Sequence, residues 1–257
     1  MEKITSKNNQ LIKDTKKLFT SPRARKENGA FVLEGARLCF DVLNSFYTVD
    51  KLFITQTVYD KYQSKADELI SKAASAYLIT DDVAAKLSDT VATQGVFAVC
   101  KMQDNSNATI SGKVIALDNV QDPSNMGAIV RTAEALGIDA IITHQGCDIY
   151  NPKALRSSMG SMLRMNIAYT DDLRSCLTNL KSQGFAVYST VPDNSAKKIT
   201  DIDFKNNSVC VIGNEANGVS DDIKQVSDAL ITIPMLGRAE SLNASVAASI
   251  TKWEMLR

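Results

Sequence analysis

Short apolar runs and longer one-sided apolar segments follow each other along most of the chain. Runs of strand type occur at 31–35 (FVLEG), 51–55 (KLFIT), 76–80 and 95–102, and segments of helix type at 36–45, 59–73 and 83–89. Mixed strands and helices of this kind predict a small α/β domain in the first hundred residues.

The pattern resumes after a polar, turn-rich stretch. Residues 103–113 (QDNSNATISGK) hold no aromatic side chain and are the best linker candidate. Beyond them strands are expected at 114–120, 138–143, 185–190, 209–213 and 229–233, and helices at 125–136, 152–165, 171–184, 220–228 and 241–256. This alternation predicts a mostly parallel sheet with helices on both faces, whose ligands gather at the carboxyl ends of strands. We therefore expect domains at 1–103 and 114–257, joined by a linker at 104–113.

Composition adds little beyond a globular class, but the local charge is informative. The 257 residues are 44% hydrophobic and 23% charged, with a net charge of +0. Residues 1–37 carry a surplus of about five positive charges, which indicates either a surface for phosphate groups or a solvated helix face.

Several site classes are disfavoured by what the sequence contains. The five cysteines are far apart and His144 is the single histidine, which argues against a Cys/His zinc site, so no metal is expected. The N-terminus has no apolar signal segment and no run of 18 apolar residues occurs, so we expect a cytoplasmic chain without a membrane span.

Three loops that follow predicted strands carry the candidate chemistry. The first, 118–127, lacks the G-x-G-x-x-G of dinucleotide sites but places Asn125 at a helix start and Arg131 under two turns later. Taken alone, Arg131 could equally lie along an apolar stripe with its charged end in solvent.

The second and third loops are also weak signals when taken singly. Gly213 and Gly218 have P-loop spacing, but Val219 and Ser220 stand where the phosphate-binding Lys and the Ser/Thr would be needed. The third loop runs from Ile231 to Ser245, and Ser241 is a candidate N-cap of the last helix.

Together these segments resemble the three signature motifs of the SpoU/TrmH-type ribose 2′-O-methyltransferases of the SPOUT superfamily. The matching residues are Asn125, Gly127, Ile129, Arg131 and Ala133, then Gly213, Glu215 and Gly218, then Ile233, Pro234, Met235, Gly237, Ser241, Leu242, Asn243 and Ser245. The usual Val after the last Asn is Ala244 here. Residues 31–37 and 93–99 resemble the L30e-like substrate-binding domain that precedes the catalytic domain in many members.

The resemblance implies a fold, a cofactor and a set of site residues. It implies a C-terminal trefoil knot, a homodimer formed through the C-terminal domain, and S-adenosylmethionine as methyl donor for a ribose 2′-hydroxyl of structured RNA, with 23S rRNA the first choice. The catalytic residues would be Arg131, Asn125, Glu215, Ser241 and Asn243. The cofactor would lie against Gly213, Ile233, Leu242, Thr190, Gly218 and Met235, and RNA phosphates against Arg156, Lys7, Arg23, Arg25 and Arg37.

Other functions stay open at this point. A tRNA could be the substrate, since RNA recognition rests on shape and single-stranded loops that no residue code reveals. A base methyltransferase of the same fold, or a non-catalytic RNA-binding protein of ribosome assembly, are the further alternatives.

Overall fold

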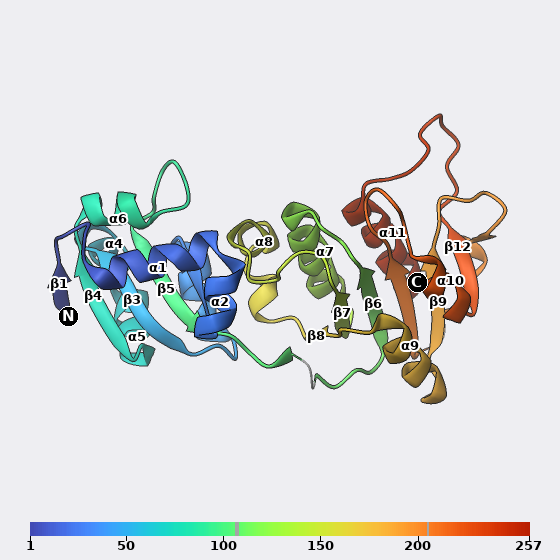
Figure 1. Ribbon diagram of the computed structural model, residues 1–257, viewed down its shortest axis with the longest axis horizontal. Coiled ribbons are helices and arrows are strands. Elements are labelled where there is room, and N and C mark those ends of the chain that lie inside the picture. The colour runs from blue at the N-terminus through green and yellow to red at the C-terminus, as the bar shows by residue number, and fades with distance from the viewer. Residues whose placement is uncertain (106–107, 205) are drawn as a thin grey trace. The chain divides into compact units, whose positions relative to one another are not determined.

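The computed structural model describes residues 1–105, 108–204 and 206–257 (Figure 1). Residues 106 and 107 of the expected linker lie outside the described residues. The chain divides into two compact units, Met1–Gln103 with Tyr150–Arg164, and Asp104–Ile149 with Met165–Arg257. Segment 150–164, which the sequence analysis placed in the second domain, is therefore part of the first compact unit.

The first unit is a five-stranded mixed sheet with helices. Its strand order is β1-β4-β3-β5-β2, and β5 runs antiparallel to both β3 and β2. The strands are β1 (Glu2–Ile4), β2 (Ala30–Glu34), β3 (Val49–Thr55), β4 (Ser75–Ile79) and β5 (Val96–Lys101). The helices are α1 (Gln10–Thr20), α2 (Pro22–Asn28), α3 (Ala36–Asp41), α4 (Gln56–Lys61), α5 (Gln63–Lys72), α6 (Asp81–Leu87) and α8 (Pro152–Ser158), with short 3-10 turns at Val42–Asn44 and Ser161–Leu163.

The returning segment is anchored in this unit by Tyr150. Its ring lies 4.5 Å from the ring of Phe31 between centroids, and its hydroxyl is 3.3 Å from that of Tyr47. The backbone N–H of Gln103 donates to the same Tyr150 hydroxyl at 3.1 Å. Because Phe31 and Tyr150 are both buried, these contacts make the segment part of the unit's core.

The second unit is a seven-stranded sheet in the order β10-β12-β9-β11-β6-β7-β8, in which every described pairing is parallel. Its strands are β6 (Lys113–Asp118), β7 (Ala140–His144), β8 (Ile167–Tyr169), β9 (Ala186–Thr190), β10 (Lys197–Lys198), β11 (Ser208–Ile212) and β12 (Ala229–Thr232). Its helices are α7 (Pro123–Leu136), α9 (Leu173–Ser182), α10 (Asp221–Val226) and α11 (Ala244–Leu256), with a 3-10 turn, η4, at Ile199–Asp201. The predicted α/β class with a mostly parallel sheet is confirmed.

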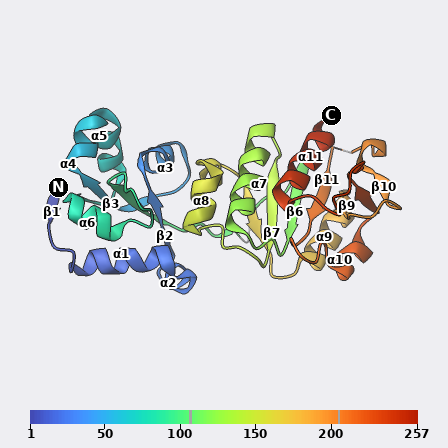
Figure 2. The same ribbon diagram turned by 90° about the horizontal axis from the view of Figure 1, so that it is seen from above.

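Helices lie on both faces of this sheet, α7 and α11 on one and α9 and α10 on the other (Figure 2). Because side chains alternate along a strand, Val114 and Ala116 of β6 pack with Leu177 of α9 and Ile223 of α10 in one buried cluster. The intervening Ile115 and Leu117 are also fully buried. Burial on both faces explains why the strands are continuous apolar runs.

The ends of α7 follow ordinary capping chemistry. Asp122 is the N-cap and accepts from the N–H groups of Ser124 and Asn125, Pro123 occupies the first turn, and Gly137 closes the helix at a φ of 79°. The predicted end of this helix at residue 136 is confirmed. The predicted trefoil knot concerns how the chain threads through itself and stays a prediction.

Candidate active site

The three loops singled out in the sequence are joined by hydrogen bonds through Asn125. The Asn125 Nδ2 donates to Glu215 Oε1 at 2.9 Å, and Asn243 Nδ2 donates to Asn125 Oδ1 at 3.0 Å. The Asn125 side chain thus uses its donor end toward the second loop and its acceptor end toward the third. Three residues that are 28 to 118 positions apart in pairs meet in one network.

Glu215 is held by backbone groups as well as by Asn125. The N–H groups of Gln121 and Asp122 each donate to its carboxylate at 3.1 Å. Partial burial by itself would raise the pKa of Glu215, but these hydrogen bonds outweigh it and leave the pKa below its ordinary value. Glu215 is therefore an anion that fixes the turn before α7.

Asn243 has a second role at the start of the last helix. Its Oδ1 accepts from the N–H of Ser245 at 2.9 Å and of Val246 at 3.4 Å, so Asn243 is the N-cap of α11. The expectation that Ser241 caps this helix is wrong, because the helix begins at Ala244 and Ser241 lies in the loop before it. One side chain therefore both begins α11 and contacts Asn125.

The loop 213–218 is narrow and held at its base. Asn214 and Gly218 exchange two backbone hydrogen bonds, of 3.0 and 2.9 Å, and Gly218 has a φ of 68°. A Cβ on Gly213 would lie 2.1 Å from the backbone of Gly218 and Val219, which only glycine avoids.

A pocket of about 530 Å³ opens between the second and third loops. Its lining includes all six residues expected to contact the cofactor, together with Glu215 and Ser241. Those six are Thr190, Gly213, Gly218, Ile233, Met235 and Leu242. Apolar side chains, exposed main chain and a volume inside the range of about 300–1,000 Å³ usual for small-molecule sites fit a nucleoside-sized ligand.

Arg131 does not line this pocket. It is exposed on α7, and among the described residues no hydrogen bond or ion pair of its side chain occurs. Its expected role as a catalytic group therefore rests on its position in the motif, under two turns after Asn125 on α7.

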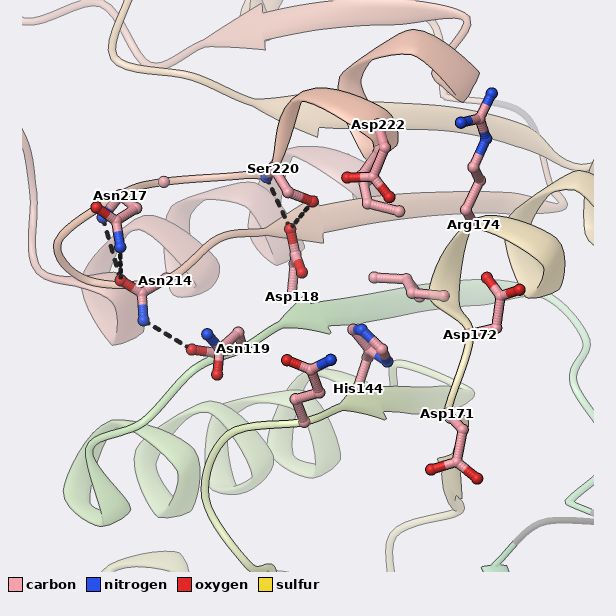
Figure 3. Close-up of a pocket in the computed structure, with 14 residues that line it drawn as sticks. Asp118, Asn119, His144, Asp171, Asp172, Arg174, Asn214, Asn217, Ser220 and Asp222 are labelled. Atoms are coloured by element: carbon pink, nitrogen blue, oxygen red, sulfur yellow. Dashed lines mark hydrogen bonds between the residues drawn. The ribbon is translucent and has the colours of Figure 1, made fainter.

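A second pocket of about 430 Å³ shares Asn214, Asn217 and Gly218 with the first (Figure 3). In it Asp118 Oδ2 accepts from the N–H and the hydroxyl of Ser220, at 2.8 and 2.7 Å. The Asn214 side chain donates to the carbonyl of Asn119 at 2.9 Å. These bonds tie the 214–220 loop to the end of β6.

Three residues support the site but were not predicted as site residues, namely Asp118, Asn119 and Asn214. Their position was the available signal, since each ends a buried strand of the parallel sheet or follows it within two residues.

The five expected RNA contacts all belong to the first unit, and one of them does not fit. Arg25 is 1% exposed, and its Nη1 donates to the carbonyls of Leu18 and Phe19 at 2.7 and 3.3 Å. It therefore satisfies the end of α1 and cannot reach a phosphate from that position.

The other four RNA candidates are accessible. Arg37 is exposed. Lys7 pairs with Asp82 at 3.0 Å, Arg23 with Glu27 at 2.7 Å, and Arg156 with Asp89 at 3.2 Å. Such surface pairs are worth at most about 1 kcal/mol and can be exchanged for phosphate contacts.

Comparison with known proteins defines the class. The SpoU rRNA Methylase family matches residues 112–253, and the MRM3-like substrate binding domain matches residues 9–98. The chain belongs to the SpoU rRNA methylase family, as its motifs indicated.

One named relative matches nearly the whole chain and another matches about half of it. The 23S rRNA (guanosine(2553)-2′-O)-methyltransferase RlmP of Bacillus subtilis is 33% identical over 256 residues, 99% of each chain. The 23S rRNA (guanosine-2′-O-)-methyltransferase RlmB of Xanthomonas axonopodis is 34% identical over 145 residues, 56% of this chain and 58% of that one. The crystal structure of an AdoMet-bound rRNA methyltransferase from Sinorhizobium meliloti superposes with a TM-score of 0.88 at 26% identity, covering 99% of this chain and 97% of that one.

No helix among the described residues is long and apolar enough to cross a bilayer.

Proposed function

We propose that this chain transfers a methyl group from S-adenosylmethionine to the 2′-hydroxyl of a guanosine ribose in 23S rRNA. The observation that carries the proposal is the Glu215–Asn125–Asn243 network beside a pocket lined by every residue expected to bind the cofactor. Support for the RNA and the base comes from two relatives whose names give guanosine 2′-O-methylation of 23S rRNA.

The bound cofactor supplies a methyl group already activated by its positive sulfur, so this chain must align the reactants and stabilise the developing alkoxide. Alignment alone can lower a barrier by about 7–11 kcal/mol. The missing Cβ of Gly213 lets the 213–218 loop close on itself beside the pocket, and Asn125 is oriented by bonds at both ends of its amide. Ser241 completes the pocket wall.

We assign Arg131 to the ribose and its phosphate. A guanidinium has a pKa above about 12 and is a poor proton acceptor, but its donors suit an alkoxide and a phosphate oxygen. The exposure of Arg131 supports this assignment, because an RNA backbone can reach it without displacing a protein partner.

We further propose that Arg37, Arg156, Lys7 and Arg23 hold RNA phosphates from the first unit. We also propose a homodimer formed through the second unit. Its support is the outer side of α11, where Val246 and Trp253 are 46% and 61% exposed, seven residues apart and so on one helix face.

Labelled methyl transfer to unmodified rRNA tests the function. The chain is incubated with methyl-labelled S-adenosylmethionine and with 23S rRNA or tRNA transcripts, and the RNA is digested to nucleosides for mass spectrometry. We expect 2′-O-methylguanosine from 23S rRNA. Label in a base or in tRNA would replace the proposal by one of the alternatives, and absence of cofactor binding would favour a non-catalytic RNA-binding protein.

Arg131→Ala tests the residue assignment in the same assay. We expect cofactor affinity within about twofold of wild type by calorimetry, and loss of at least a hundredfold in methyl transfer, the range seen when one donor to an oxyanion is removed. Arg174→Ala, which removes an exposed arginine of α9 in the same unit, is the matched control. Methylation by Arg131→Ala at the wild-type rate would show that the assignment is wrong.

A further inference from the structure

The last helix contains a lysine that is completely buried. Lys252 of α11 is 0% exposed, whereas lysines almost never bury fully unless they are paired. Burial lowers the pKa of its amine to about 7. Burial of an amine is unfavourable unless the amine is hydrogen-bonded. The hydrogen-bond partners of Lys252 all lie on one neighbouring helix.

Those partners are in the middle of α7. The Lys252 Nζ donates to the carbonyl of Ile129 at 2.8 Å and to the hydroxyl of Thr132. The Thr132 hydroxyl in turn lies 3.0 Å from the carbonyl of Ala128 and 3.3 Å from Ser249 Oγ. The hydroxyl thus accepts from the lysine amine and donates to a carbonyl of its own helix.

Arg131 lies inside the segment that this cluster holds. Ile129 and Thr132 flank it, and at about 100° per residue it projects from a different side of the helix than either. The buried side of the turn is therefore fixed by Lys252 while the Arg131 side stays exposed. The other end of α11 contacts α7 through Asn243 and Asn125 at 3.0 Å.

We propose that Lys252 is a positioning residue for the methyl transfer: its amine clamps the central turn of α7 to α11 and so sets the place of Arg131 relative to Asn125. The two helices are joined at two points about two and a half turns apart along α11. On α7 these points are Asn125 and the pair Ile129 and Thr132. With both points in place, α7 cannot rotate or slide on α11. The inference rests on the proposed function of Arg131.

Lys252→Met tests the clamp, because methionine keeps most of the length of the chain and removes the donors. We expect kcat for rRNA methylation to fall at least tenfold, while the KM for RNA and the Kd for the cofactor stay within about twofold. The melting temperature should not fall, because the substitution removes a buried amine whose desolvation is unfavourable and this offsets the lost hydrogen bonds. Thr132→Val, which removes the hydroxyl at nearly constant shape, should lower kcat in the same direction, and the double variant should lose no more than the larger single loss.

Lys181→Met is the matched control. Lys181 of α9 also donates to a backbone carbonyl of the next helix, that of Val226 at 2.8 Å, but on the face of the sheet away from α7. We expect its kcat to be unchanged. A wild-type kcat in Lys252→Met would overturn the inference. So would a loss of activity that is fully explained by a smaller fraction of folded protein or by weaker cofactor binding. A wild-type chain that methylates no RNA would instead overturn the proposed function.

Discussion

Individual polar side chains in the second unit are fixed by their hydrogen-bonding capacity. Asn125 must present its carbonyl to Asn243 and its amino group to Glu215, so only one orientation of the amide satisfies both neighbours. Asp118 receives both donors of Ser220 in the same way. The site is thus held by short polar side chains with few rotamers, which suits a reaction that depends on alignment.

The titration of Lys252 gives a residue-scale prediction. Its pKa is about 7 when folded and about 10.5 as an ordinary lysine, so between these values the unfolded chain binds more protons than the folded one. The free energy of unfolding should therefore rise with pH across this window, by roughly 2 kcal/mol from pH 7 to 9, and this rise should be absent in Lys252→Met.

Urea unfolding of both proteins at the two pH values measures the effect, because their shared titrations cancel in the difference. Four elements pack against α11, namely α7, β6, β11 and η4. Their charged or titratable side chains are Arg131 and Glu134 on α7, Lys113 and Asp118 on β6, Cys210 on β11 and Asp201 on η4, and α11 itself carries Glu254 with Arg257 directly after it. Equal slopes for the two proteins would contradict a buried amine.

At this scale the sequence predicted the motif residues but not the buried basic ones. The pocket residues were recognisable because their spacing matches a pattern. Arg25 and Lys252 each stand in helical segments where a basic side chain is usually solvated, and their burial depends on carbonyls of Leu18 and Ile129 that only the tertiary structure brings near.

At the scale of elements, the shape of the site in the second unit is set by its loops and helix starts. The Asn214 Oδ1 accepts from the N–H groups of Ala216 and Asn217, which shapes the tip of the 213–218 loop from within. The base of the loop is closed by Asn214 and Gly218, and its exit is held by Asp118. The loop is therefore a preformed wall of the proposed cofactor pocket.

Gly213→Ala tests whether this wall tolerates change. The new Cβ would meet backbone atoms at 2.1 Å, so the loop must shift, and we expect cofactor affinity to fall at least tenfold with a lower melting temperature. Gly237→Ala in the third loop meets nothing within 4 Å and should melt at the wild-type temperature. A Gly213→Ala chain that binds the cofactor normally would show that the loop is pliable.

The elements that the sequence missed are α1 and α2, where the basic residues 1–30 gave no predicted element, and the short strands. The runs at β1, β8 and β10 have two or three residues, too few for a period to show, and each lies at or near a sheet edge where only one neighbour defines it. The long strands β6 and β11 were predicted because both of their faces are buried. The helix predicted at 152–165 ends at Ser158, where Met159 adopts a left-handed conformation with a φ of 54°.

The molecule as a whole presents different chemistry on its two units. The first unit carries accessible basic side chains, and the second carries the pocket and the exposed apolar side of α11. An exposed tryptophan with an apolar residue two turns away is typical of a protein–protein contact.

Trp253→Asp tests the proposed homodimer at this scale. We expect the wild-type chain to sediment at twice its 28.0 kDa mass and the variant at the monomer mass, because burying a charge in an apolar contact is unfavourable. Tyr169→Asp, on exposed edge strand β8, is a control for surface charge and should leave the mass unchanged. A wild-type chain that sediments as a monomer at micromolar concentration would contradict the proposal.

Residues 150–164 belong to the first unit, and this limits how recombination can separate the two units. The backbone crosses between them three times, so no single recombination point yields both parts whole. A fragment ending at Gln103 would lack Tyr150, leaving Phe31 beside a vacated space and the Tyr47 hydroxyl without its neighbour. A chimera that replaces only residues 1–103 would keep the old α8 segment, which packs in the first unit. The replacement would therefore have to include residues 150–164 as well.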